Sequence, residues 1–253
     1  MSTRNVRTAA VILAGGKGLR MGGDTPKQYL LLEGRPLLCH TLDAFEAAAS
    51  VDATLVVVGA ADVDRVRAEL TEVYGPFAKL VDVVAGGRER YDSSKCGLDA
   101  LLTRPETYDI VLVHDAARAL VSAGCIDRVV QKAAETGACV AAVPVTDTVK
   151  QSADGDRIDR TLPRKELFAV QTPQGFATDL LTTAYAAMEE QRTQAPEAFA
   201  ETAKNITDDA SVVERYTDHP VYLAQGEATN RKVTLADDLD FVNYILHMRK
   251  DGI

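Results

Sequence analysis

The chain has 253 residues, 46% of them hydrophobic, and a formal net charge of −9. This length and apolar content allow a substantial core. An acidic chain offers no broad basic face to neutralise a nucleic-acid backbone, so nucleic acid is not expected as the main partner. An anionic substrate would have to be attracted by a local cluster of cations.

Other features argue against several further classes of protein. The four cysteines lie far apart and form no CxxC pair, which predicts reduced thiols rather than a disulfide framework. The four histidines show no metal-ligand spacing, so no zinc site is expected. No apolar stretch approaches the length of a transmembrane helix, and the first one is too short for a signal peptide. We expect a cytoplasmic protein with no membrane partner.

Short apolar segments alternate with amphipathic segments along the chain. Strands are predicted at 9–13, 54–58, 80–84, 110–113, 139–143, 168–170 and 221–223. Helices are predicted at 37–49, 61–74, 93–102, 125–136, 179–190, 208–215 and 235–249. This alternation predicts a three-layer α/β fold, in which helices cover both faces of a mainly parallel twisted sheet, within a single domain, 1–253. Ligands of such sheets bind beyond the carboxyl ends of the strands.

Two segments interrupt this alternation. The polar segment 146–163, with turn residues at Asp154-Gly155, predicts a protruding β-hairpin arm. An isolated two-stranded hairpin is marginally stable in water, so the arm is expected to pack against a second copy of the chain in a homodimer. The segment 191–204 is rich in Ala, Glu and Gln, and it is expected to be a surface extension without a chemical role.

The first predicted strand runs into AGGKGLRMGGDTPKQY, residues 14–29, in which five of sixteen residues are glycine. Glycines allow the backbone to approach an anion closely, and the interspersed cations Lys17, Arg20 and Lys27 suit a polyphosphate. An ordinary connection with solvated cations is the alternative. The P-loop spacing is absent, and the dinucleotide fingerprint fails at Met21, where its third glycine should stand.

The loops after later strands carry further candidates. Asp115 and Arg118 of VHDAAR suit a substrate hydroxyl and a phosphate, although an Asp and an Arg at this spacing also form plain surface pairs. Ser93 of GGRERYDS either caps a helix or contacts a base. Thr207 of TDDA is expected to cap a helix. Lys232, before the last helix, is either functional or a solvated charge.

Taken in order, seven motifs resemble those of the 2-C-methyl-D-erythritol 4-phosphate cytidylyltransferase family, over most of the chain. They are AGGKGLRM with PKQY, GGRERYDS, VHDAAR, PVTDTVK, QTPQGF, TDDAS and NRKVT. The resemblance implies a Rossmann-like nucleotidyltransferase fold. It also implies that a sugar-phosphate oxygen attacks the α-phosphorus of CTP with Mg²⁺ and releases pyrophosphate, in non-mevalonate isoprenoid synthesis.

The resemblance also implies roles for individual residues. Arg20 and Lys27 match the transition-state stabilisers, Lys232 matches a residue that positions the phosphates, and Arg164 matches one that reaches a partner's site from the arm. The implied CTP contacts are Ala14, Gly15, Gly16, Gly18, Gly87, Ser93 and Ala116. The implied substrate contacts are Asp115, Arg118, Thr148 and Thr207. Mg²⁺ is expected to be held mainly by the CTP phosphates, with no direct protein ligand. Arg88 stands where the family often has an acidic residue, so its contact with the base is open.

Other functions stay open at this point. A ribitol 5-phosphate cytidylyltransferase would have a similar loop, although the DTVK and HDAAR forms favour the methylerythritol enzyme. An NAD-dependent oxidoreductase is disfavoured by Met21 and by the lack of an acidic residue after a second strand. A non-catalytic nucleotide sensor is disfavoured because all the cationic positions are retained.

Overall fold

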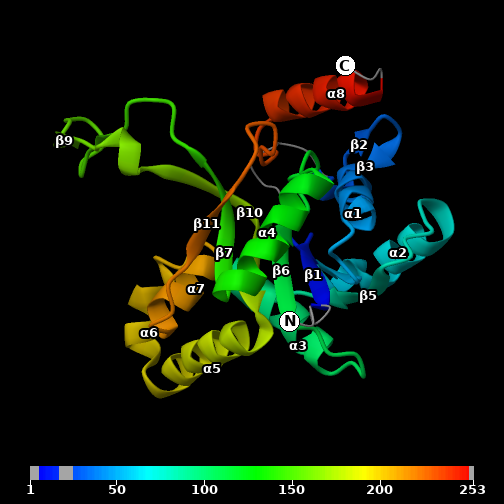
Figure 1. Cartoon of the computed structure of the whole chain (residues 1–253), viewed down its shortest axis with the longest axis horizontal. Helices are drawn as coiled ribbons and strands as arrows, with labels where there is room; N and C mark the ends of the chain where they lie inside the picture. The colour runs from blue at the N-terminus through cyan, green and yellow to red at the C-terminus, as the bar shows by residue number, and fades with distance from the viewer. Residues whose placement is uncertain (1–5, 17–24, 251–253) are drawn as a thin grey trace.

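A central sheet organises the computed structural model, which describes residues 6–16 and 25–250 (Figure 1). In this part of the chain seven strands pair in the order β11-β7-β10-β6-β1-β4-β5, and β10 alone runs antiparallel to its neighbours. The strands are β1 (Thr8–Leu13), β4 (Ala53–Val58), β5 (Leu80–Ala85), β6 (Ile110–Asp115), β7 (Ala138–Pro144), β10 (Phe168–Ala177) and β11 (Tyr222–Gln225). The mainly parallel α/β sheet is therefore confirmed.

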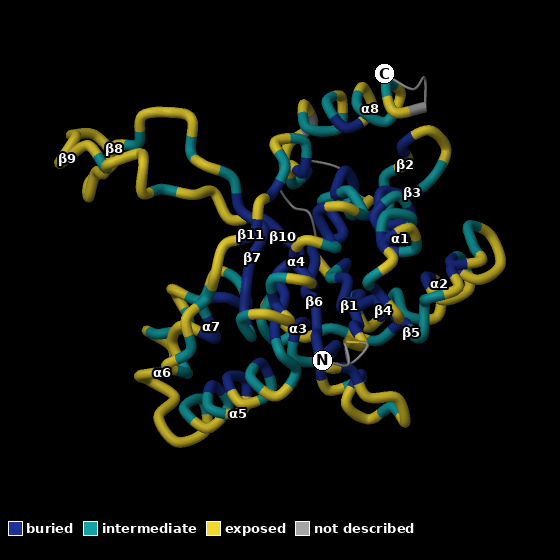
Figure 2. The backbone as a smooth tube through the Cα atoms, viewed as in Figure 1, coloured by how far each residue is buried: buried dark blue, intermediate teal, exposed yellow. Residues whose placement is uncertain are grey.

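Two layers of helices cover the sheet (Figures 1 and 2). On one face, apolar side chains of α1 (Leu37–Ala47), α2 (Val63–Ala68) and α4 (Ala123–Thr136) pack against the strands. On the other face lie α3 (Arg90–Leu102), α5 (Thr178–Gln194), α6 (Pro196–Ala203) and α7 (Asp209–Tyr216). Strands β1, β4 and β6 are buried along almost their whole length, as continuous apolar runs between two helical layers should be.

Helix α8 (Ala236–Lys250) lies apart from these two layers (Figure 1). Its Val242 packs with Leu37 at the start of α1, with Leu120 after β6 and with Val233 just before α8. Arg249 donates a hydrogen bond to the carbonyl oxygen of Leu120 at 2.9 Å. These contacts fix the segment that precedes α8 against the loop that follows β6.

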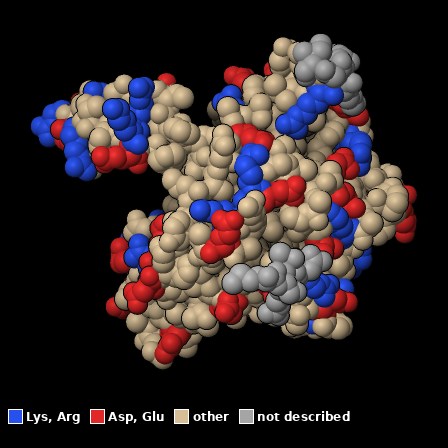
Figure 3. Space-filling view, in the orientation of Figure 1, with Lys and Arg blue, Asp and Glu red and all other residues tan. Residues whose placement is uncertain are grey.

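The hairpin arm is present as predicted. Between β7 and β10 the chain leaves the body and forms a small antiparallel pair of β8 (Lys150–Gln151) and β9 (Arg160–Thr161) (Figure 1). At its tip Gly155 has a φ of 80°, and the Asp154 carboxylate accepts hydrogen bonds from two backbone N–H groups further along the turn. Most arm residues are exposed (Figure 2). Basic side chains cover much of the arm on the face shown in Figure 3.

Four local features differ from the predictions. Strand β10 extends far beyond the predicted 168–170. The prediction ended too early because the residues from Gln171 to Gln174 are mostly polar, although they are buried, and so carry no apolar pattern. The segment 191–204 is largely helical, and Phe199 of α6 packs into the core. The predicted helix 61–74 is a 3-10 turn, α2 and a π-helical turn, Glu69–Val73. A small pair, β2 (Leu31–Leu32) and β3 (Arg35–Pro36), was not predicted.

Candidate active site

The register of the sheet brings two of the predicted loops together. Leu13, the last residue of β1, pairs with Asp115, the last residue of β6. The next backbone N–H, that of Ala116, donates to the carbonyl oxygen of Leu13 at 3.0 Å. The glycine-rich loop and the VHDAAR loop therefore leave the sheet side by side at the carboxyl ends of parallel strands, where ligands of such sheets bind.

The start of the glycine-rich loop is held by Gln28, whose side-chain amide donates to the carbonyl oxygens of Ala14 at 2.6 Å and Gly16 at 3.0 Å. Gly18 and Arg20 lie outside the described residues. Lys27 donates to the carbonyl oxygen of Val233 at 2.7 Å. This contact places one predicted catalytic lysine beside the segment that carries the other, Lys232.

Asp115 is the centre of a cluster of charged side chains, which we call the Asp115 cluster: Asp115, Arg90, Arg118, Lys232 and Asp209. Lys232 donates to Oδ2 of Asp115 at 2.7 Å, and Arg90 Nε donates to Oδ1 at 3.3 Å. Arg118 Nε lies 3.9 Å from Oδ2. Arg90 also donates to the fully buried Asp209 at 2.6 Å. Four segments of the chain thus supply one cluster: α3, the end of β6 with the loop after it, α7, and the loop before α8.

The Asp115 cluster holds three cations against two carboxylates, an excess of one positive charge. Burial alone would raise the pKa of Asp115, but Arg90, Lys232 and Arg118 outweigh it and hold that pKa well below its usual range. In the part of the chain that the structure describes, the buried Nη2 of Arg90 and Nε of Arg118 have no hydrogen-bond partner. Excess charge and unused donors together suit an anionic ligand.

A buried network behind the cluster fixes the Asp115 backbone. The Thr172 hydroxyl accepts a hydrogen bond from the N–H of Asp115 at 3.1 Å and lies 3.0 Å from Nδ1 of His114. Complete burial lowers the pKa of His114 to about 3, so the ring is neutral. Thr172 then donates to Nδ1, and the opposite ring N–H faces the carbonyl oxygen of Arg118 at 3.4 Å.

The loop after β5 is shaped by tight packing on α3. A Cβ atom at Gly87 would lie 2.3 Å from the Cβ of Asp92, so only glycine fits there. Ser93 accepts a hydrogen bond from the N–H of Gly87 at 3.2 Å. The interpretation of Ser93 as a helix cap is wrong, because α3 begins at Arg90 and Glu89 is its N-cap, paired with Asp92 in a capping box. The Arg88 side chain is almost fully exposed.

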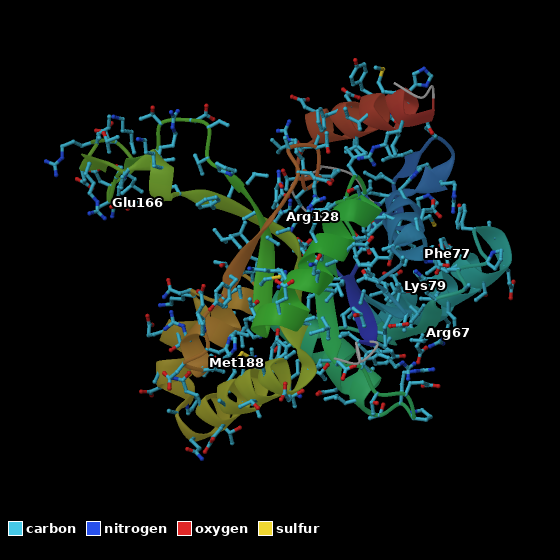
Figure 4. The ribbon with its side chains drawn as sticks, in the orientation of Figure 1. Arg67, Phe77, Lys79, Arg128, Glu166 and Met188 are labelled. Carbon is cyan, nitrogen blue, oxygen red and sulfur yellow. The ribbon has the colours of Figure 1, made fainter. Side chains whose placement is uncertain are left out.

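Of the remaining predicted residues, Thr207 adjoins the Asp115 cluster through Asp209, whereas Thr148 and Arg164 belong to the arm. Thr207 is not the cap of α7, because the Asp208 carboxylate accepts from the N–H of Ser211 at 2.9 Å and fills that role. Thr148 is exposed on the arm. Arg164 donates to the carbonyl oxygen of Thr146 at 2.7 Å, and its near neighbour Glu166 is labelled on the arm in Figure 4. Within one copy of the chain, Thr148 and Arg164 therefore lie apart from the Asp115 cluster.

Sequence reasoning assigned no role to three residues of this region: Arg90, Asp209 and Thr172. All three stand inside motifs that were recognised, GGRERYDS, TDDAS and QTPQGF. Spacing could not identify them, since Arg90 and Asp209 are separated by 119 positions. The available signal was their position inside these motifs, since Thr172 lies within β10 and Asp209 opens α7, away from any loop that follows a strand.

The model of the 2-C-methyl-D-erythritol 4-phosphate cytidylyltransferase family matches residues 8–248. The chain belongs to this family. It is therefore a nucleotidyltransferase, and the expectation from the motifs is confirmed. A 2-C-methyl-D-erythritol 4-phosphate cytidylyltransferase of Alkaliphilus oremlandii is 39% identical over 97% of this chain and 98% of its own. One of Lachnoclostridium phytofermentans is 38% identical over 98% of this chain and 99% of its own.

A solved structure agrees with these sequence matches. The 4-diphosphocytidyl-2C-methyl-D-erythritol synthase of Anaerococcus prevotii has a TM-score of 0.76 and 28% identity, covering 96% of this chain and all of that one. None of these three proteins is named as a ribitol 5-phosphate enzyme, so that alternative gains no support. No helix among residues 6–16 and 25–250 combines the length and the apolar character needed to cross a membrane.

Proposed function

We propose that the site joins CTP and 2-C-methyl-D-erythritol 4-phosphate. An oxygen of the sugar phosphate attacks the α-phosphorus of CTP, a new P–O bond forms, and the bond to the β-phosphate breaks. The products are 4-diphosphocytidyl-2-C-methyl-D-erythritol and pyrophosphate. The observation that carries the proposal is the Asp115 cluster, with its excess positive charge beside the glycine-rich loop. A reaction of this kind needs positioning and charge stabilisation more than covalent chemistry from the protein.

We assign the CTP half of the site to the two glycine-containing loops and to the cations beside them. The backbone of Ala14, Gly15, Gly16, Gly18, Gly87 and Ala116, with the Ser93 hydroxyl, would hold the nucleotide. Arg20 and Lys27 would stabilise the charge that develops on the phosphates. Lys232 would place the α-phosphate next to the attacking phosphate. The contact of Lys27 with the segment that carries Lys232 supports this grouping.

We assign the sugar-phosphate half to Asp115, Arg118, Thr148, Thr207 and Arg164. A carboxylate with a strongly lowered pKa remains an acceptor for a substrate hydroxyl over the whole physiological range. Arg118 keeps an unused nitrogen for the anion. Arg164 would clamp the substrate phosphate. No general base is required, because the attacking phosphate is already an anion.

Mg²⁺ would enter with the triphosphate. Both Asp115 oxygens already accept hydrogen bonds from cations, so this carboxylate suits an orienting role better than an inner-sphere ligand. In the described segments no group of three or more His, Cys, Asp or Glu residues is placed to hold a metal ion. Mg²⁺ prefers phosphate oxygens and water, and it would neutralise charge on the triphosphate. Removing it with a chelator should abolish turnover, and adding it back should restore turnover.

We also infer that the chain is a single domain that works as a cytoplasmic homodimer. The arm exposes Phe168 and Val170 at its return to the sheet and Ile158 near its tip. A two-fold pair offers each arm the same partner surface. The arm of one copy would then deliver Arg164 and Thr148 to the Asp115 cluster of the other copy.

One panel of assays tests the proposed reaction. Pyrophosphate release is measured from CTP with 2-C-methyl-D-erythritol 4-phosphate and, separately, with ribitol 5-phosphate, while NADH absorbance is followed with the same protein. We expect release with the methylerythritol substrate alone. Faster release with ribitol 5-phosphate, or turnover of NADH without pyrophosphate, would overturn the proposal.

A further inference from the structure

Arg90 links three elements of the body at one point. It is the first residue of α3, directly after the loop that contains Gly87. Its Nε donates to Asp115 at the end of β6, at 3.3 Å, and its Nη1 donates to Asp209 in the first turn of α7, at 2.6 Å. No other cation–carboxylate contact in the described part of the site joins two carboxylates from different elements through one side chain.

The far side of this link is rigid. Asp209 is fully buried, and its other oxygen accepts from the Tyr185 hydroxyl at 2.7 Å. Burial beside Asp209 raises the pKa of Tyr185, so the hydroxyl keeps its proton as a donor. The Gln174 side chain accepts from the backbone N–H groups of Asp209 and Ala210 at 3.0 and 3.1 Å. Arg90 is thus anchored on a fixed, buried carboxylate.

The near side of the link reaches the proposed substrate contacts. Oδ1 of Asp115 accepts a hydrogen bond from Arg90, and Oδ2 accepts one from Lys232. The carboxylate that Arg90 orients therefore also holds Lys232. Thr207 stands two residues before Asp209, just outside α7. A displacement of Arg90 would therefore move Asp115, Lys232 and the residues from Thr207 to Asp209 together.

We propose that Arg90 is a positioning residue for cytidylyl transfer. It holds Asp115 and Lys232 in fixed positions relative to Thr207, so that an oxygen of the sugar phosphate is placed for in-line attack on the α-phosphorus. This inference rests on the proposed function. Arginine suits the role because its fork reaches two carboxylates in fixed directions, whereas a lysine ammonium is a single point charge.

A purely structural role for Arg90 is the competing explanation. Asp209 is a buried carboxylate, and removing its counter-ion would leave an uncompensated charge that destabilises the fold. The single variant Arg90→Met therefore cannot separate the two explanations. The pair Arg90→Met with Asp209→Asn can, because it removes the buried charge together with the cation that neutralises it.

The experiment compares wild type, Asp209→Asn, the double variant and Arg90→Lys. Thermal melts report stability, and pyrophosphate release reports kcat and separate KM values for CTP and 2-C-methyl-D-erythritol 4-phosphate. We expect the double variant to melt close to Asp209→Asn. Its kcat/KM for the sugar phosphate should fall below that of Asp209→Asn by roughly 10²-fold, the cost typical of a displaced reacting group, while its KM for CTP stays within about 3-fold.

The Arg90→Lys variant keeps a charge beside Asp209 and guards against failure of the double variant to fold. We expect it to fold and to lose roughly 10-fold or more in kcat/KM for the sugar phosphate, because one ammonium cannot orient both carboxylates. Kinetics equal to those of Asp209→Asn in the double variant, or equal to wild type in Arg90→Lys, would overturn the positioning role. A wild-type protein that releases no pyrophosphate would instead refute the proposed function itself.

Discussion

The Asp115 cluster and the arm are built in opposite ways. The cluster gathers side chains from four segments of the chain at the carboxyl ends of buried strands, and each charged group has partners within one copy of the chain. The arm is a hairpin of two-residue strands, and Arg164 contacts only the base of that same hairpin in the interactions described. One half of the proposed site is therefore preorganised by the fold, whereas we propose that a second copy of the chain positions the other half.

This contrast has a physical basis in burial. Buried ion pairs need excellent geometry to offset desolvation. In the Asp115 cluster the backbone N–H groups of Asp115 and Asp209 donate to Thr172 and Gln174, and the Tyr185 hydroxyl donates to the Asp209 carboxylate. An ion pair between exposed side chains on the arm, such as that of Arg157 with Asp159, is screened by water and contributes little stability. In the interactions described, the arm therefore forms no buried cluster of charges comparable to the Asp115 cluster.

The largest expected effect is loss of a preorganised cation. Lys27→Ala should lower kcat by roughly 10²-fold or more, because charge stabilisation is aimed at the transition state. Arg20→Ala, outside the described residues, should do the same. Lys27 is partly exposed and donates a hydrogen bond to the carbonyl oxygen of Val233, so the melting temperature of Lys27→Ala should fall by only about 2–4 °C, the shift expected from the loss of one such bond. Lys204→Ala, which removes an exposed cation on the body, is the matched control and should leave kcat unchanged. A sharp fall in the melting temperature of Lys27→Ala would support a structural role instead.

The nucleotide half should also select its base without help from the arm. Close backbone at Gly15, Gly16 and Gly87 is expected to leave no room for a purine, so ATP should turn over more slowly than CTP by roughly 10²-fold. Calorimetry should show that Arg164→Ala binds CTP as wild type does. Equal turnover of ATP and CTP would refute the assignment of the base pocket.

The arm can be tested by complementation. Arg164→Ala and Lys232→Ala subunits should each be nearly inactive alone. If Arg164 acts in trans, each heterodimer pairs one intact site with one doubly damaged site, and an equal mixture should regain roughly a quarter of wild-type activity.

Two controls make this result decisive. Exchange of differently tagged subunits, followed by pull-down, establishes that heterodimers form. If Arg164 acts in trans, the double variant Arg164→Ala with Lys232→Ala, mixed with wild type, gives heterodimers in which both sites are damaged, so only the wild-type homodimers in the mixture remain active. Mixed single variants that exchange subunits and yet stay inactive would rule out a shared site.

The sequence predicts the frame of the molecule well, for a definite physical reason. Strands such as β4 and β6 are continuous apolar runs, the loops that follow β1 and β5 carry glycine and charge, and the loop that follows β6 carries Arg118. Apolar periodicity and turn chemistry are local properties, and both can be recognised in a short window of sequence. The positions of the hairpin arm and of most helices follow from the same properties.

The contacts inside the site could not be predicted in this way. The bond between Arg90 and Asp209 joins residues 119 positions apart, and nothing local distinguishes Asp209 from its neighbour Asp208. Asp208 caps α7, whereas Asp209 is buried, and only the packing of α7 against α5 decides which carboxylate takes which role. The buried polar half of β10 was missed for the same reason, because its partners come from other elements.

The smallest expected effect concerns stability rather than activity, and it depends on burial in the body. His114 is fully buried and its pKa is lowered to about 3, whereas an unfolded histidine titrates near 6.5. Below about pH 6.5 the unfolded chain binds a proton at this histidine, whereas the folded chain does not bind it until the pH approaches 3. The contribution of His114 to the free energy of unfolding is therefore at its highest above about pH 6.5, and it decreases progressively as the pH falls toward 3.

Between pH 7 and pH 5 this difference should lower the free energy of unfolding by about 2 kcal/mol. Urea denaturation at the two pH values measures it. His114→Gln retains an acceptor and a donor but cannot titrate, so its loss of unfolding free energy between pH 7 and pH 5 should be smaller than that of wild type by about the same amount.

Phe45→Leu, which disturbs the ring packed against His114 at 5.0 Å, is the matched control, and it should lower stability equally at both pH values. The lowered pKa of Asp115 does not interfere, because a carboxylate that is ionised in both the folded and the unfolded chain contributes no slope above pH 5. An identical pH dependence in His114→Gln and wild type would show that the buried ring is not the source of acid sensitivity.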